Sequence, residues 1–165
     1  MSESKSASDP DRALAALITR CEPSALIAFG ERAQWLAQQW QQAHEDCALT
    51  LMEAADTRHG LTLERVQDLA LISNTLEHLS RTDGQALLGQ LRNYGTHQIA
   101  VLDSERSEWT LNDFIALGFR RQAQLEDNGE AFNLYTYNID NYNHKRDWNN
   151  PRFWANPEMW GKSWW

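Results

Sequence analysis

The sequence predicts an α/β fold, a doubly wound and mostly parallel sheet with an antiparallel C-terminal hairpin strand. Short apolar runs alternate with segments whose apolar residues recur at helical spacing. Strands that alternate with helices pair in parallel through right-handed crossovers. The last two runs flank Asp127-Asn128-Gly129, a strong hairpin signal. The expected architecture is therefore Rossmann-like with one reversed strand.

Size and charge limit the classes of function. A chain of 165 residues forms one domain, and its 15 Lys and Arg against 23 Asp and Glu give a net charge of −8. This charge opposes non-specific attraction to nucleic acid or to an anionic membrane, so neither is expected as a partner. Cys21 and Cys47 are far apart, which favours a reduced, cytoplasmic protein. No apolar run approaches the ~20 residues of a membrane span.

The N-terminal residues supply a leader and a first helix. Residues 1–8 are polar and Ser-rich, and we expect them to be disordered. The folded domain should span residues 9–139. A helix is expected from Asp9, as the N-cap, to Glu22, because the apolar residues between them lie on one helical face.

A strand–helix–strand unit follows. Residues 24–29 form an apolar run that is closed by Gly30, and residues 33–40 repeat with helical period. Residues 47–52 give a second strand, which ends at Glu53. This pattern predicts two neighbouring parallel strands joined by one helix.

The second half of the chain continues the alternation. Residues 54–66 give a weak signal, with a short strand as one interpretation of Leu61, Leu63 and Arg65. The remaining elements are a strand at 68–72, a helix capped near Thr82 or Asp83 and ended by Gly95, a strand at 98–102, a helix from Thr110 to Gly118, and strands at 119–126 and 130–139.

Residues 24–139 resemble a class I S-adenosylmethionine-dependent methyltransferase. The likeness is strongest at ISNTLEHLSRTDGQALLGQLRNYG, IAVLDSE and FIALGFRRQAQL. These are similar to the family's segment after strand four, its fifth strand and the lead-in to its sixth strand. The order of these motifs carries the resemblance, which implies a doubly wound fold and a nucleoside cofactor.

The resemblance also implies a cofactor site. Gly30 matches the glycine turn after the first strand, and Glu53 matches the acid that binds the ribose. Ser73 and Asn74 match the wall of the methyl-transfer pocket. The region between strands two and four is short, and it offers Arg58, His59 or Glu64 for the adenine. Gly30 is a single glycine where the family has several. Glu31 beside it would repel the carboxylate of the methionyl part of the cofactor unless Arg32 compensates this charge.

Other chemistry receives less support. His78 is either a general base or a packing and capping residue. Asp103, which ends the strand at 98–102, reaches the same crevice or is a turn-forming acid. No catalytic residue can be assigned. The histidines are scattered without zinc-site spacing, so no metal is expected, and no serine or cysteine has the context of a hydrolase nucleophile.

The C-terminal tail, residues 140–165, is unusually aromatic. It holds five of the eight tryptophans, and its ending, NPEMWGKSWW, is similar to that of a small group of uncharacterised bacterial proteins. Its four Lys and Arg against three Asp and Glu give +1, which leaves −9 on the rest. The tail either packs on the domain or docks a partner, including a second copy in a homodimer.

Two functional hypotheses remain open. The first is a methyltransferase-like domain that binds S-adenosylmethionine or a related nucleoside and methylates a small molecule. The second is a degenerate methyltransferase fold without catalysis that works as a binding or scaffold protein through its Trp-rich tail. The partner is then a small molecule or a protein.

Overall fold

The computed structural model describes residues 9–57, 60–61, 63 and 65–139. The predicted leader and tail, and the adenine-site candidates Arg58, His59 and Glu64, lie outside the described residues. The elements are α1 (Asp9–Cys21), β1 (Ala25–Phe29), α2 (Glu31–Ala43), β2 (Ala48–Met52), the 3-10 turn η1 (Ala54–Thr57), β3 (Leu69–Ser73), the 3-10 turn η2 (Leu76–His78), α3 (Arg81–Asn93), β4 (Gln98–Ser104), α4 (Leu111–Ala116), β5 (Arg120–Asp127) and β6 (Glu130–Asn138).

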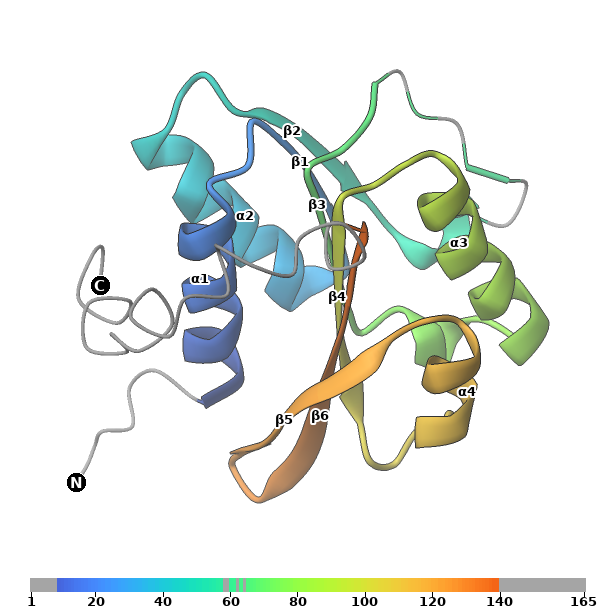
Figure 1. Cartoon of the computed structure of the whole chain (residues 1–165). Helices are drawn as coiled ribbons and strands as arrows, with labels where there is room; N and C mark the ends of the chain where they lie inside the picture. The colour runs from blue at the N-terminus through green and yellow to red at the C-terminus, as the bar shows by residue number, and fades with distance from the viewer. Residues whose placement is uncertain (1–8, 58–59, 62, 64, 140–165) are drawn as a thin grey trace, which may run out of the picture.

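The strands form one six-stranded mixed sheet in the order β2-β1-β3-β4-β6-β5 (Figure 1). The first four strands pair in parallel, and β6 runs antiparallel to both β4 and β5. Asn128 and Gly129 join the hairpin with φ of 53° and 84°. Two positive φ values are those of a type I′ turn, whose twist matches the hairpin. The predicted fold class is confirmed.

Two helical layers cover the sheet (Figure 1). Helices α1 and α2 lie on one face and bury a core with β1, β3 and β4 that includes Leu36, Trp40 and Leu71. Helices α3 and α4 cover the other face, where Phe114 of α4 stacks on Tyr135 of β6 at 3.8 Å between ring centroids. Strands β1 and β3 are buried along their whole length because they lie between the two layers.

The longest helices, α1, α2 and α3, have 13 residues each. Within the described residues, no helix is long and apolar enough to cross a bilayer.

Helix α3 begins earlier than predicted, because Ser80 rather than Thr82 or Asp83 is its N-cap. The Ser80 hydroxyl accepts from the backbone N–H of Asp83 at 3.0 Å.

The short strand considered around Leu61, Leu63 and Arg65 is not present in the described residues of that region. Side chains of α3 and of its C-cap residue Tyr94 form hydrogen bonds with the Leu61 backbone groups that would otherwise pair with a neighbouring strand. The Leu61 N–H donates to Gln90 Oε1 at 2.7 Å, and the Leu61 carbonyl accepts from the Tyr94 hydroxyl at 2.6 Å. Leu61 is buried and is held against α3 by these two hydrogen bonds.

Candidate functional site

The strand register brings the predicted cofactor residues to one edge of the sheet. Phe29 of β1 lies opposite Met52 of β2 and Ile72 of β3. The next residue on each strand is therefore at the carboxyl edge, and Gly30 lies between Glu53 and Ser73. In open α/β sheets, ligands bind at this edge.

Gly30 is in direct contact with Ser73. Its φ of 91° lies in the region that favours glycine, and a Cβ atom at this position would lie 1.6 Å from the Ser73 carbonyl oxygen. That oxygen also accepts from the Thr75 hydroxyl at 2.7 Å. Gly30 thus allows β1 to turn directly into α2 against the end of β3. The resemblance implies that Gly30 is the glycine turn of a cofactor site, and the group that lies against Gly30 in this structure is the Ser73 backbone.

The Ser73 side chain caps α2 from a neighbouring strand. Its Oγ accepts from the backbone N–H of Ala33 at 2.9 Å, and Ser73 is 1% exposed. The N-cap residue itself is Gly30, which has no side chain to do this. Ser73 therefore joins β3 to the start of α2, a role that the sequence alone did not indicate.

We expect Ser73→Ala to lower the free energy of unfolding by about 1–3 kcal/mol, because it leaves a buried N–H without its acceptor. Urea titration followed by far-UV circular dichroism measures the change. Ser24→Ala removes the same hydroxyl at an exposed position and should stay within about 0.5 kcal/mol of wild type. Equal stabilities for the two variants would contradict the capping role.

Glu53 is an exposed carboxylate at the carboxyl edge of the sheet. It follows β2 directly, and its Oε2 accepts from Gln34 Nε2 at 3.0 Å. The same Gln34 nitrogen donates to the Met52 carbonyl at 2.8 Å, and the Glu53 N–H donates to Asp56 Oδ2 at 2.9 Å. Gln34, which sequence reasoning missed, therefore fixes one carboxylate oxygen. No sequence motif signals this contact, because it depends on α2 lying over the end of β2.

Asn74 and His78 follow β3 at the same edge. Asn74 is exposed and has a φ of 48°, a left-handed conformation that Asn adopts more readily than most residues. His78 is exposed in the 3-10 turn η2. Asn74 therefore lies exposed just past the carboxyl end of β3.

The first turn of α2 is poorly suited to a bound carboxylate. Arg32 donates to Asp11 of α1 at 2.7 Å and to Asp127 of β5 at 3.0 Å, so two acids already engage its charge. Arg32 therefore does not offset Glu31 in the way the resemblance requires. The Ala33 N–H is bound to Ser73, so it is not available to a ligand at this helix start.

Asp103 is buried within β4 and is not a surface turn residue. It is 3% exposed, its Oδ2 accepts from the Ser107 hydroxyl at 2.8 Å, and its Oδ1 has no hydrogen-bond partner among the described residues. Burial raises the pKa of Asp103 to about 6; the Ser107 hydrogen bond opposes this shift and the charge of Glu77 adds to it. Asn133 lies directly opposite on β6, and its buried Oδ1 also lacks a partner there.

Metal chemistry finds no site in the part of the chain that the structure describes. No three His, Cys, Asp or Glu side chains are grouped there in a way that could hold an ion.

The carboxyl edge combines an exposed acid, Glu53, an exposed amide, Asn74, and a buried carboxyl group, Asp103. Carboxylates and amides of this kind bind hydroxyl and amine groups of organic ligands.

The mixed sheet between two helical layers defines a Rossmann-like domain. The chain is similar to the Burkholderia thailandensis 1,6-didemethyltoxoflavin-N1-methyltransferase with bound S-adenosylhomocysteine, with a TM-score of 0.54 and 12% identity over 82% of this chain and 79% of that one. It is also similar to the O-methyltransferase from neocarzinostatin biosynthesis, with a TM-score of 0.53 and 13% identity over 76% of this chain and 52% of that one. For human N-acetylserotonin methyltransferase the values are 0.50 and 13%, over 79% and 51%. At these identities the likeness establishes the fold.

The chain belongs to a family of unknown function, DUF6231, whose family model matches residues 8–165. The match includes both the described domain and the Trp-rich tail. A comparison with curated proteins finds no sequence match. The fold class and the family are thereby defined, and the activity has to be argued from the residues at the carboxyl edge.

Proposed function

We propose that this protein binds an adenosyl nucleoside, S-adenosylmethionine or a close relative, at the carboxyl edge of its sheet. The observation that carries the proposal is the register of β1 and β2, which sets exposed Glu53 beside Gly30. An acid after the second strand is suited to accept from the ribose hydroxyls, as in dinucleotide-binding folds. Gln34 holds one oxygen of this carboxylate, which reduces the freedom that Glu53 would lose on binding.

The activity that follows is methyl transfer to a small molecule. The cofactor would supply an activated methyl group, and the protein would chiefly hold the acceptor in line with it. Exposed Asn74 stands at the same edge and can donate to an acceptor through its amide. The methyltransferases of similar fold named above lend support to this assignment.

A second candidate function rests on the first turn of α2. A methionyl carboxylate would meet Glu31, an Ala33 N–H already bound to Ser73, and an Arg32 already engaged by acids. The nucleoside half of the cofactor therefore suits this edge better than the amino-acid half. These contacts favour the alternative of a methyltransferase fold without a cofactor, which acts as a binding or scaffold protein through its Trp-rich tail.

Isothermal titration with S-adenosylmethionine, S-adenosylhomocysteine and adenosine separates the two functions. The nucleoside proposal predicts that all three bind, and that Glu53→Ala weakens each by at least about ten-fold, since hydrogen bonds to a charged acceptor contribute about 1.5–3 kcal/mol. Glu126→Ala removes an exposed acid from β5 and serves as the matched control, with unchanged affinity.

Two results would count against the proposal. The first is that none of the three ligands changes the melting temperature at millimolar concentration, which would favour the cofactor-free function. The second is full affinity in Glu53→Ala, which would remove Glu53 from the site even if a ligand binds.

A further inference from the structure

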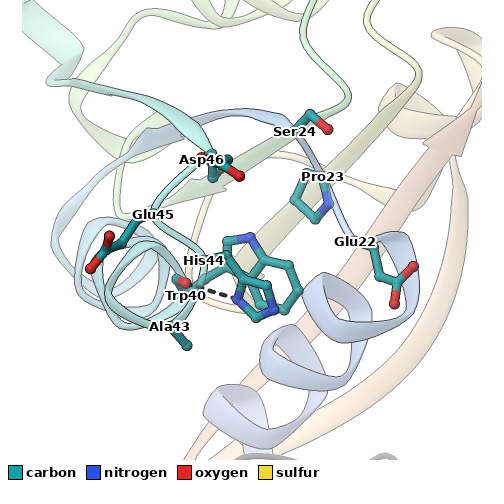
Figure 2. A pocket seen from close by; sticks show the side chains of 9 residues that line it. Glu22, Pro23, Ser24, Trp40, Ala43, His44, Glu45 and Asp46 are labelled. Atoms are coloured by element: carbon teal, nitrogen blue, oxygen red, sulfur yellow. Dashed lines mark hydrogen bonds between the residues drawn. The ribbon is translucent and has the colours of Figure 1, made fainter.

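A pocket lies at the amino edge of the sheet, opposite the carboxyl edge that holds Glu53 (Figure 2). This pocket of about 410 Å³ is formed by the chain between α1 and β1 and by the end of α2 with the loop to β2. Its base is an aromatic pair, in which the exposed His44 ring stacks on the buried Trp40 ring at 3.5 Å between centroids and 12° between planes. His44 Nδ1 lies 3.1 Å from the Trp40 carbonyl oxygen, which fixes the ring further.

Three acidic residues, Glu22, Glu45 and Asp46, line the pocket beside this aromatic pair. Glu22 and Glu45 stand on opposite sides of it in Figure 2, and Asp46 follows Glu45 in the same loop. All three are exposed, and no Lys or Arg is among the residues that line the pocket. The surface is therefore negative around a flat aromatic base, which suits a segment that carries both cationic and aromatic side chains.

The C-terminal tail leaves the fold at the same edge. Asn138 of β6 lies opposite Gln98, the first residue of β4, and the Ile139 N–H donates to the His97 carbonyl at 2.9 Å. From β6 to β1 the sheet order crosses three strand spacings, or about 14 Å at ~4.8 Å each. Six extended residues span up to about 20 Å, so Lys145 can reach the pocket from Ile139.

We propose that the tail of the same chain, residues 140–165, docks on this pocket. Lys145 and Arg146 pair with the acidic rim, and Trp148 lies against the outer face of His44. The charges agree with this placement, since the tail carries +1 and the rest of the chain −9. The site is at the other edge of the sheet from Glu53, so the docking is independent of the proposed nucleoside site.

Carbodiimide cross-linking of the full-length protein tests the contact. This reagent joins an amine to a carboxylate only when they touch, and the chain has three lysines, Lys5, Lys145 and Lys162. Mass spectrometry should find Lys145 joined to Glu45, Asp46 or Glu22 within one chain. An equal mixture of 14N- and 15N-labelled protein distinguishes a link between two copies. Links between copies, or Lys145 joined only to acids elsewhere, would overturn the proposal.

Trypsin cleavage after Lys145 and Arg146 provides a second measurement. Neutralising the rim with Glu22→Gln, Glu45→Gln and Asp46→Asn should increase the initial cleavage rate there by about ten-fold, because the docked segment is released. The matched control neutralises three exposed acids that do not line the pocket, Glu105 and Glu108 after β4 and Glu126 in β5, and should leave the rate unchanged. A rate that is unchanged in the rim variant would contradict docking at this pocket.

Discussion

Replacing Gly30 with alanine is expected to lower the free energy of unfolding by at least about 4 kcal/mol, a large part of the total for a domain of this size. The added Cβ would lie 1.6 Å from the Ser73 carbonyl oxygen and 2.6 Å from its carbon. The Ser73 backbone is held by the pairing of β3 with β4, opposite Leu102, and cannot move aside as a flexible side chain can. The φ of 91° adds strain of about 1–3 kcal/mol for any residue with a side chain. Urea unfolding followed by circular dichroism measures the loss.

The same Gly→Ala substitution at two other positions serves as a reference for Gly30→Ala. Gly95 has a φ of 84° and no atom within 4 Å of an added Cβ, so Gly95→Ala measures the strain alone and should cost about 1–2 kcal/mol. Gly89 lies inside α3 with open space around it, and Gly89→Ala should stabilise the protein by about 0.5–1 kcal/mol. A Gly30→Ala protein as stable as Gly95→Ala would show that the contact with Ser73 is not tight.

The sequence predicted the strands well because the signals for them are local. β1 and β3 are continuous apolar runs bounded by turn residues, and the hairpin has an Asn-Gly pair that accepts two positive φ values. The sequence around Leu61 lacked such signals. The Leu61 N–H and carbonyl are bonded to Gln90 and Tyr94, about thirty residues away, and such contacts leave no pattern in the sequence.

The candidate site was predicted less completely, for a related reason. The positions of Gly30, Glu53 and Asn74 at one edge followed from strand order, which a sequence pattern can supply. The hydrogen-bond partners at this edge did not follow from the strand order. That Ser73 caps α2, and that Gln34 holds Glu53, depends on how α2 lies across the ends of β2 and β3.

The burial of Asp103 depends on its pairing with β6, which the local sequence does not indicate. An acid after an apolar run is ordinarily the end of a strand. Here β4 continues to Ser104 because β6 supplies pairing partners up to Phe132. The antiparallel strand thereby buries a carboxyl group that would have been exposed at the edge of a purely parallel sheet.

This burial makes the stability of the protein depend on pH. The pKa of Asp103 rises from 3.8 to about 6 in the folded state, so the folded protein binds this proton more tightly than the unfolded chain does. The contribution of Asp103 to stability is therefore greatest below about pH 4 and is lost as the pH rises to about 6. A shift of about two pKa units corresponds to about 3 kcal/mol.

Asp103→Asn is accordingly expected to stabilise the protein by about 2–3 kcal/mol at pH 8 and to have little effect at pH 4. The amide is neutral throughout, so no buried charge forms, and its NH2 group can donate to the Asn133 Oδ1, which has no partner among the described residues. Urea titrations of both proteins at pH 4, 5, 6, 7 and 8 measure the difference in the free energy of unfolding. Glu126→Gln, which neutralises an exposed acid, should show no comparable trend.

The shape of this difference with pH tests the cause. If burial of the charge is responsible, the gain must appear between about pH 4 and pH 6 and then level off. A gain that is constant with pH would point to the new amide hydrogen bond alone. A variant less stable than wild type at pH 8 would mean that the Asp103 carboxylate is held by a partner that compensates its burial, such as a donor group of a bound ligand at the carboxyl edge.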